Sequence, residues 1–550
     1  FHSETTSQFE TSHSIRSDNP FRSSLVASYT MMPVVARSAP ALAWAPVMQV
    51  PVAARSLARR AHGRATGVKA SANAEAQATV LADPHMATSV TTPVTPAATP
   101  AAMTYPGLND DLRFQQHWSV AMWRDFKASD LFPEGGNSSL TGRLGEAARS
   151  LREGVTATGA LKNIDHARYW AYHVSRTSFF LLQAIVGLFI AQSGGSAGSA
   201  SATPTKLETI VTGARGPLAE VLLMYYQDLQ NIKEGKYGFP WDMETVRHRQ
   251  FNPLFVLQRA AAFMGEARLT MQRKNAQQPD SVWLKSGLLP QYYQNTFHYQ
   301  TDGWLSADSA KIYETSTETL FLGRQDAMQR CTLVPLHDYL QGRDPAQLRA
   351  LEVAAGTGRF ATYVKDNWPT LPLTVSDLSP YYLAEARSNA KHWHQLRAGG
   401  AWLGGAEGTG CDFLQTPAEK IDAPDASFDI VYSIYLFHEL PPAILRAAVR
   451  EMARVVKPGG LVVLTDSQQL GDRSVFNSEM HKFGDFNEPY YRAYIQTDLG
   501  QLFEEAGLTC DTKVQGSSTK TLSFRKPTVP ATEGRAILER SFSMDSMDEE

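Results

Sequence analysis

The sequence predicts an α/β protein in which a parallel sheet covered by helices follows a mostly α-helical domain. Downstream of Arg349, short apolar runs alternate with helical stretches about five times, a pattern typical of a parallel sheet with helical crossovers. Residues 107–345 instead contain long stretches at helical spacing, for example Pro217–Gln230 and Phe255–Arg268. The change of pattern indicates two folded parts.

The length of the chain agrees with this division. At 550 residues it exceeds the roughly 100–200 residues that one domain usually contains. We therefore expect a helical domain at 106–340 and a sheet-containing domain at 341–526. Residues 71–105, rich in Ala, Thr and Pro, are expected to be a disordered linker, and residues 527–550 a disordered acidic tail.

The composition is that of an ordinary soluble protein. Hydrophobic residues make up 43%, charged residues 19%, and the formal net charge is -3, so the basic excess that nucleic acid requires is missing and we expect no nucleic-acid partner. The three cysteines, Cys331, Cys411 and Cys510, fit neither a disulfide framework nor the spacing of a zinc site, and no metal site is expected. The oligomeric state does not follow from the sequence.

The most apolar run, Phe179–Ala191, contains Gln183 and falls short of the ~20 residues that span a bilayer. A buried helix is therefore expected rather than a transmembrane segment. The Gly/Ser-rich stretch after it, 194–205, is expected to be a flexible loop. Peripheral contact with a membrane surface stays open.

Residues 1–70 at the N-terminus have the composition of an organelle-targeting sequence. From Met32 to Ala70 there are five arginines and one lysine but no acidic residue, as in a transit peptide, with Met31 and Met32 as candidate initiators. Val68-Lys69-Ala70 resembles the processing site of green-algal chloroplast precursors. We expect a chloroplast protein, in the stroma or on a membrane surface, with the mitochondrion as the alternative.

A glycine-rich turn and an acidic residue point to an adenosine ligand. The strand Leu351–Ala354 runs into Ala355-Gly356-Thr357-Gly358, where glycine lets the backbone turn sharply and approach a ligand. The next strand ends in Asp377, whose carboxylate can accept hydrogen bonds from a ribose diol. The alternative is that Asp377 only caps the helix that starts near Pro380. A nicotinamide site would share these features, but the third spaced glycine is missing.

The motifs LEVAAGTGRF, VSDLSP, AEKIDAPDASFDIVYSIYLFHELP and VVKPGGLVVLTD, in that order and spacing, resemble class I S-adenosylmethionine-dependent methyltransferases. The resemblance is closest to the branch of the ubiquinone and menaquinone C-methyltransferases and covers about residues 345–525. It implies a Rossmann-like sheet, S-adenosyl-L-methionine as the cofactor and a small-molecule methyl acceptor. The segment 292–330, which begins with YYQNTFHYQTDGW, also resembles uncharacterised methyltransferase-like proteins of plants and cyanobacteria, which favours the plastid address.

The resemblance also implies which residues hold the cofactor. The implied cofactor-binding residues are Glu352, Ala354, Gly356, Gly358, Asp377, Leu378, Ala418 and Glu419. This chain departs from the family in having Pro417 where an acidic residue usually faces the adenine amine. A proline side chain cannot accept that proton, so the contact must come from Glu419, from backbone or from Asp412.

Aromatic residues of the helical half could line a pocket for a flat or lipophilic acceptor, although helix core is the favoured interpretation of most of them. Trp304 and Tyr313 are the better pocket candidates, because they precede the first strand, where the family places a helix over the cofactor. A substrate lid is expected at His481–Tyr491.

Methyl transfer needs an aligned acceptor and, for a hydroxyl or acidic C–H, a general base. His438 and Glu439, after the fourth strand, are the candidate catalytic residues, with His481 as a further candidate. The alternative for His438 is that it orders the loop or caps the next helix.

Two other functions stay open. The fold could serve as a non-catalytic binding or assembly module, with Pro417 as a sign of lost cofactor binding, or the acceptor could be a protein. The first alternative is disfavoured because the chain contains Gly356, Gly358 and Asp377.

Overall fold

The computed structural model describes residues 105–131, 149, 152, 155–156, 163–193, 215–276, 285–296, 300–397, 408–478, 480 and 488–528. The predicted address at 1–70, nearly all of the linker and tail, the loop at 194–205 and most of the lid lie outside the described residues.

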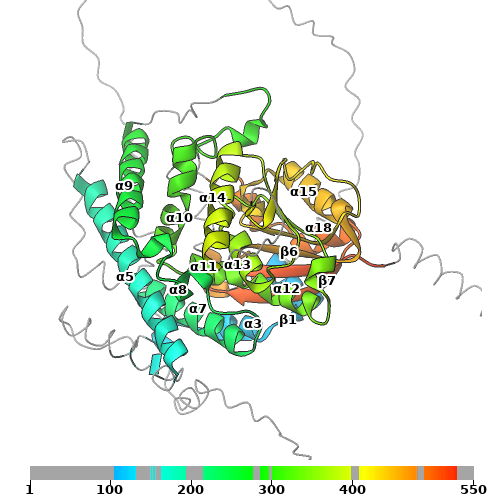
Figure 1. The fold of residues 1–550 in the computed structure, drawn as a ribbon, viewed down its shortest axis with the longest axis horizontal. Helices are drawn as coiled ribbons and strands as arrows, with labels where there is room; N and C mark the ends of the chain where they lie inside the picture. Colours follow the sequence, from blue (N-terminus) through cyan, green and yellow to red (C-terminus); the bar gives the residue numbers. More distant parts are fainter. Residues whose placement is uncertain are drawn as a thin grey trace, which may run out of the picture. The chain divides into compact units, whose positions relative to one another are not determined.

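The described residues contain one eight-stranded sheet in the order β1-β7-β8-β6-β5-β2-β3-β4 (Figure 1). From β4 through β6 the neighbouring strands are parallel, whereas β8 is antiparallel to both β6 and β7. The strands are β1 (Gln115–Gln116), β2 (Ala350–Val353), β3 (Leu373–Asp377), β4 (Cys411–Gln415), β5 (Phe428–Ile434), β6 (Val456–Ser467), β7 (Thr509–Gly516) and β8 (Thr519–Arg525). The predicted Rossmann-like sheet is confirmed, and β7 and β8 pair as an antiparallel hairpin beside β6.

Helices cover this sheet and form most of the region before it. The helices are α2 (Pro106–Arg113), α3 (Trp118–Asp125), α5 (Ile164–Ser193), α7 (Arg215–Lys233), α8 (Trp241–Glu244), α9 (Pro253–Ala276), α10 (Ala307–Leu320), α11 (Gln325–Arg330), α12 (Leu333–Leu340), α13 (Arg359–Asn367), α14 (Pro380–Arg397), α15 (Pro442–Val455), α17 (Tyr491–Tyr494) and α18 (Leu499–Glu505). Helices α5, α9 and α10 contact one another and lie side by side in Figure 1.

Both faces of the sheet are buried, which explains the continuous apolar runs in the sequence. Along β6, Leu461 and Val463 belong to a core cluster shared with α7, α11, α13 and α14, while Val462 and Leu464 belong to a cluster shared with α15 and α18. Successive side chains of a strand point to opposite faces, so a strand covered on both sides must be apolar at every position.

The helical half is attached to the sheet by strand pairing and by buried ion pairs. Strand β1 pairs in parallel with the edge strand β7. Glu220 of α7 binds the guanidinium of Arg473, which follows β6, through oxygen–nitrogen distances of 2.8 and 2.9 Å, and both side chains are buried. The described residues of both halves belong to one compact unit, and the boundary near residue 340 stays a prediction.

The strand before β5 is β4 (Cys411–Gln415), and the segment that begins at Ala418 is a turn. One expectation needs correction. The apolar run in α5 is helical as predicted, but Leu182 and Val186 are 60% and 42% exposed, since only one face of this helix meets the core.

Among the described residues, no helix combines the length and the apolar character needed to cross a bilayer.

Candidate cofactor and acceptor site

The turn after β2 bends through three residues in the left-handed backbone region. Ala354, Gly356 and Gly358 have φ values of 55°, 57° and 64°. This conformation is strained for alanine, and such strain concentrates at functional sites. Helix α13 begins directly after Gly358, so the turn brings the N-terminal end of α13 and the C-terminal end of β2 to the same place.

Asp377 fixes this turn to the neighbouring strand. One carboxylate oxygen accepts a hydrogen bond from the backbone N–H of Gly356 at 2.8 Å, and the other accepts from the N–H of Ser379 at 2.8 Å. Burial raises the pKa of Asp377 to about 6, although the backbone N–H groups oppose this rise. The carboxylate therefore orders the start of α14 and also lines the cavity described below. Its contact with a ribose stays a prediction.

Glu352 is a second buried carboxylate beside the turn. Its side chain lines the cavity and accepts a hydrogen bond from the hydroxyl of Tyr432 at 3.2 Å. Burial raises the pKa of Glu352 to about 8. A positively charged ligand group nearby would favour its ionised form, because an opposite charge offsets the cost of burial.

An aromatic layer lies against Leu378. Tyr293 and Trp304 stack with their ring centres 5.0 Å apart, and both belong to a small apolar cluster that contains Leu378. Tyr292, next to this cluster, donates a hydrogen bond to Glu419 at 2.9 Å.

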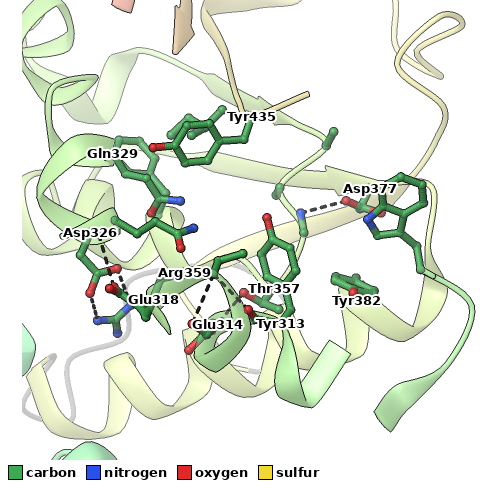
Figure 2. A pocket seen from close by; sticks show the side chains of 18 of the residues that line it. Tyr313, Glu314, Glu318, Asp326, Gln329, Thr357, Arg359, Asp377, Tyr382 and Tyr435 are labelled. Atoms are coloured by element: carbon green, nitrogen blue, oxygen red, sulfur yellow. Dashed lines mark hydrogen bonds and ion pairs between the residues drawn. The ribbon is translucent and has the colours of Figure 1, made fainter. Parts of the chain in front are cut away.

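One cavity connects these parts. It has an empty volume of about 1620 Å³, counted together with the space open to solvent. Its lining includes the predicted cofactor residues Glu352, Ala354, Gly356, Asp377, Leu378 and Ala418, together with Tyr292, Tyr293, Trp304, Tyr313, Tyr435 and Glu439. Figure 2 shows Asp377 and Tyr382 toward one side and Gln329 and Tyr435 toward the other, with Tyr313 between them.

Two predicted cofactor residues are not part of the lining. Gly358 packs against α14 instead, and the side chain of Glu419 is held by Tyr292. Asp412, the other candidate for the adenine contact, is exposed and also outside the lining. Pro417 lines the cavity. The contact of the protein with the adenine amine stays a prediction.

The expected pocket role of Trp304 and Tyr313 agrees with their place in the lining. Other aromatic residues of the helical half, such as Tyr225 and Trp241, are at most 1% exposed and belong to the core, as the favoured interpretation predicted. No sequence pattern pointed to Arg176, Glu318 and Gln329, which line the cavity from helices α5, α10 and α11.

The two candidate catalytic residues have different positions. Glu439 lines the cavity, whereas His438 lies behind it, with Nδ1 2.5 Å from Asp466 and Nε2 3.2 Å from Glu439. Burial by itself lowers the pKa of His438, but the two carboxylates outweigh it and raise the pKa well above its usual value. A protonated imidazole cannot accept a proton, so this geometry favours Glu439 as a base and His438 as the residue that positions it. The catalytic assignment stays a prediction.

One group of side chains near the cavity has the spacing of metal ligands. The potential ligand atoms of His438, Glu439 and Glu488 lie within 4.8 Å of one another. In the structure, both ring nitrogens of His438 contact carboxylates, an arrangement that an imidazolium satisfies by itself.

The donor set of the cavity fits an adenosine ligand with a sulfonium and an amino group. Asp377 offers carboxylate oxygens for a ribose diol, and Glu352 offers negative charge for an ammonium group. Aromatic ring faces such as that of Tyr313 attract a positive sulfur.

The packing of the turn predicts that Gly358→Ala destabilises the protein. A Cβ at this position would lie 2.8 Å from the Cβ of Ala386, and the backbone is left-handed, so the free energy of unfolding should fall by about 2 kcal/mol or more. Gly265→Ala on α9 is the matched control: its Cβ would meet nothing within 4 Å, so stability should rise by about 0.5–1 kcal/mol. Urea unfolding followed by circular dichroism measures both, and equal stability of the two variants would contradict the packing.

Comparisons with known proteins agree with this site. A family described as "Methyltransferase domain" matches residues 351–464. An uncharacterized methyltransferase of Synechocystis sp. is 26% identical over 161 residues, covering 29% of this chain and 66% of that protein. The demethylmenaquinone methyltransferase of Deinococcus radiodurans is 34% identical over 118 residues, covering 22% and 42%. The 2-methyl-6-phytyl-1,4-hydroquinone methyltransferase of Synechocystis sp. is 40% identical over 63 residues, covering 12% and 19%.

The chain thus spans between 19% and 66% of the length of these relatives. The matched region contains β2, the glycine turn, Asp377 and the strands up to β6, which together form the cofactor side of the cavity. Residues 351–464 therefore match a methyltransferase domain, and this match implies S-adenosylmethionine as the cofactor.

Proposed function

We propose that this protein transfers the methyl group of S-adenosylmethionine to a small, lipophilic or aromatic acceptor in the chloroplast. The observation that carries this proposal is the continuity of the cavity. The residues suited to the cofactor and a second region lined by the helical half belong to the same space, so two ligands can meet within it. The names of two relatives, which act on menaquinone and hydroquinone compounds, support an acceptor of this kind.

The residues around the turn would hold the cofactor. Asp377 and Glu352 bind its hydroxyl and amino groups, and Gly356 allows the ligand to approach the backbone closely. When bound, S-adenosylmethionine supplies a methyl group made electrophilic by a positively charged sulfur. The protein then has to orient the acceptor and exclude competing water.

Glu439 is proposed to take the proton of an acceptor hydroxyl or acidic C–H. It lines the cavity next to Tyr435, and His438 contacts its carboxylate from behind. His438 in turn is fixed by Asp466, so the orientation of Glu439 depends on two buried neighbours. This arrangement supplies a positioned base without requiring His438 to lose its own proton.

The chloroplast location rests on the composition of residues 32–70. In an import assay, we expect isolated chloroplasts to take up the full chain and shorten it near Ala70. Uptake and shortening by mitochondria alone would contradict this proposal.

Cofactor affinity should decrease as the pH falls through about 6. Burial raises the pKa of Asp377 in the free protein to about 6, and only the ionised carboxylate can accept hydrogen bonds from both ribose hydroxyls. Below this pH the proton must be released on binding, so the affinity should fall by up to about tenfold per pH unit.

Calorimetric titration of S-adenosylmethionine between pH 7 and pH 5 measures this effect. Asp377→Asn should bind about 10- to 100-fold more weakly at pH 7 and show a smaller pH dependence. The exposed Asp308→Asn is the matched control and should behave as the wild type. An affinity of the wild type that is constant over this range would rule out the proposed role of Asp377.

Replacement of the proposed base should affect the chemical step. Glu439→Gln keeps the size of the side chain but cannot accept a proton as a carboxylate does, so kcat should fall by about 100-fold or more. The Kd of S-adenosylmethionine should stay near the wild-type value, and Glu505→Gln on the exposed side of α18 should change neither. Full methyl transfer by the Glu439 variant would assign the base elsewhere.

A further inference from the structure

Helices α5 and α9 form the outer layer of the helical half. Helix α14 contacts strands β3 and β4, α10 contacts α14, and both α5 and α9 contact α10. Figure 1 shows α5 and α9 next to each other and farther from the sheet than α10. They also contact each other, since a Cβ placed on Gly187 of α5 would lie 3.7 Å from the Cε of Met264 of α9. Their outer surfaces therefore adjoin.

Exposed apolar side chains gather on this layer. Of the thirteen large apolar side chains that are exposed among the described residues, six lie on α9, on the turn directly before it and on the part of α5 near Gly187. We call these six the α5–α9 face: Leu182, Val186, Phe251, Leu254, Leu257 and Leu269. Each of them is between 42% and 64% exposed. Single exposed apolar residues are normal on a protein, but a group of them marks a surface for interaction.

The exposed side of α9 combines an apolar stripe with positive charge. The exposed residues at intervals of three or four are Leu254, Leu257, Ala261, Gly265 and Leu269. Residues at these intervals lie on one side of a helix. Among all exposed residues from Leu254 to Leu269, Arg268 is basic and none is acidic. This combination is typical of helices that lie on the surface of an anionic membrane.

The acidic charge of α9 does not belong to this exposed side. Glu266 is the sole acidic residue in the sequence of α9, and its carboxylate accepts a hydrogen bond from the backbone N–H of Thr301 at 3.0 Å. The sequence of α9 also places Arg273 and Lys274 near the C-terminal end of the helix. The helix therefore carries more positive than negative charge, which complements an anionic lipid surface.

The same two helices line the cavity. Phe179 and Phe180 of α5 and Phe255 and Val256 of α9 belong to its lining. In the chain, each of these pairs lies within two positions of a leucine of the α5–α9 face. A ligand that is soluble in lipid would therefore meet apolar side chains both at this face and inside the cavity. A bilayer docked at the face would supply such a ligand directly.

From these observations we infer that the α5–α9 face docks on the surface of an anionic lipid bilayer. Its apolar side chains enter the boundary between head groups and acyl chains, and Arg268 meets the lipid phosphates. A second copy of the chain would also cover the apolar side chains, but it would bring the same basic charge to this face, whereas an anionic bilayer brings the opposite charge. The inference goes beyond the proposed function and does not depend on methyl transfer.

The test places a fluorophore on the α5–α9 face of the full chain. In a Cys510→Ser background, Leu257→Cys is labelled with NBD, whose fluorescence rises in an apolar environment; Cys331 and Cys411 are buried and stay unlabelled. Vesicles of phosphatidylcholine with about 30% phosphatidylglycerol should raise the fluorescence about twofold or more. Vesicles of phosphatidylcholine alone should require about tenfold more lipid for the same rise, because they lack the negative charge.

Leu112→Cys, labelled in the same background, is the matched control. Leu112 is also exposed, but it lies on α2, which packs against α18 and β7. Its fluorescence should stay unchanged when vesicles are added, even where another part of the chain tethers the protein to them. Far-UV circular dichroism checks that both labelled variants are folded.

Any of three results would overturn the inference. They are no rise at Leu257 with the phosphatidylglycerol vesicles, an equal rise at Leu257 and Leu112, and a rise at Leu257 that depends on protein concentration without lipid, which would assign the face to a second copy. Binding of S-adenosylmethionine is measured separately by calorimetry. A protein that docks but does not bind the cofactor would contradict the proposed function alone, and one that binds the cofactor but does not dock would contradict this inference alone.

Discussion

The contacts of Arg359 are the constraint on which the site depends. This residue is the first of α13, directly after the glycine turn, and its guanidinium binds Asp326 of α11 and Asp242 of α8. Burial opposes ionisation of Asp242, but Arg359 together with His248 and Arg176 outweighs it, and the pKa of Asp242 is lowered to about 2. The turn that faces the cofactor is thereby tied to two helices of the preceding half. Removal of one partner would leave a buried charge without compensation, which is why such pairs hold their elements firmly in place.

These ion pairs explain why the helical half lines the same cavity as the sheet. Helices α10 and α11 supply Tyr313, Glu318 and Gln329 to the same cavity that the sheet supplies with Asp377. A Rossmann-like sheet by itself presents its ligand at the carboxyl ends of the strands and leaves the outer side of that crevice open. Here the preceding helices provide the facing wall, so residues outside the matched methyltransferase domain form a large part of the cavity lining.

Burial has different consequences for the side chains at the two ends of the cavity. At the cofactor end, Asp377 and Glu352 are carboxylates whose pKa values are raised by burial, so a ligand with hydroxyl or ammonium groups stabilises their ionised forms. At the other end, Arg176 and Arg359 are paired with buried carboxylates such as Asp326. The buried Oε1 of Gln329 has no hydrogen-bond partner among the described residues.

The sequence by itself determined the sheet, the turn and the acid, because each depends on local rules. Strand alternation with helices, glycine at left-handed positions and a carboxylate at the end of β3 are recognisable without knowing the rest of the fold. Only the tertiary structure decided which side chains meet. Gln329 and Glu318 carry no local signal, His438 lies behind the cavity in contact with Asp466 and Glu439, and Gly358 packs against Ala386. These roles depend on contacts between residues far apart in the chain, and the pattern of one segment contains no information about the segment that will pack against it.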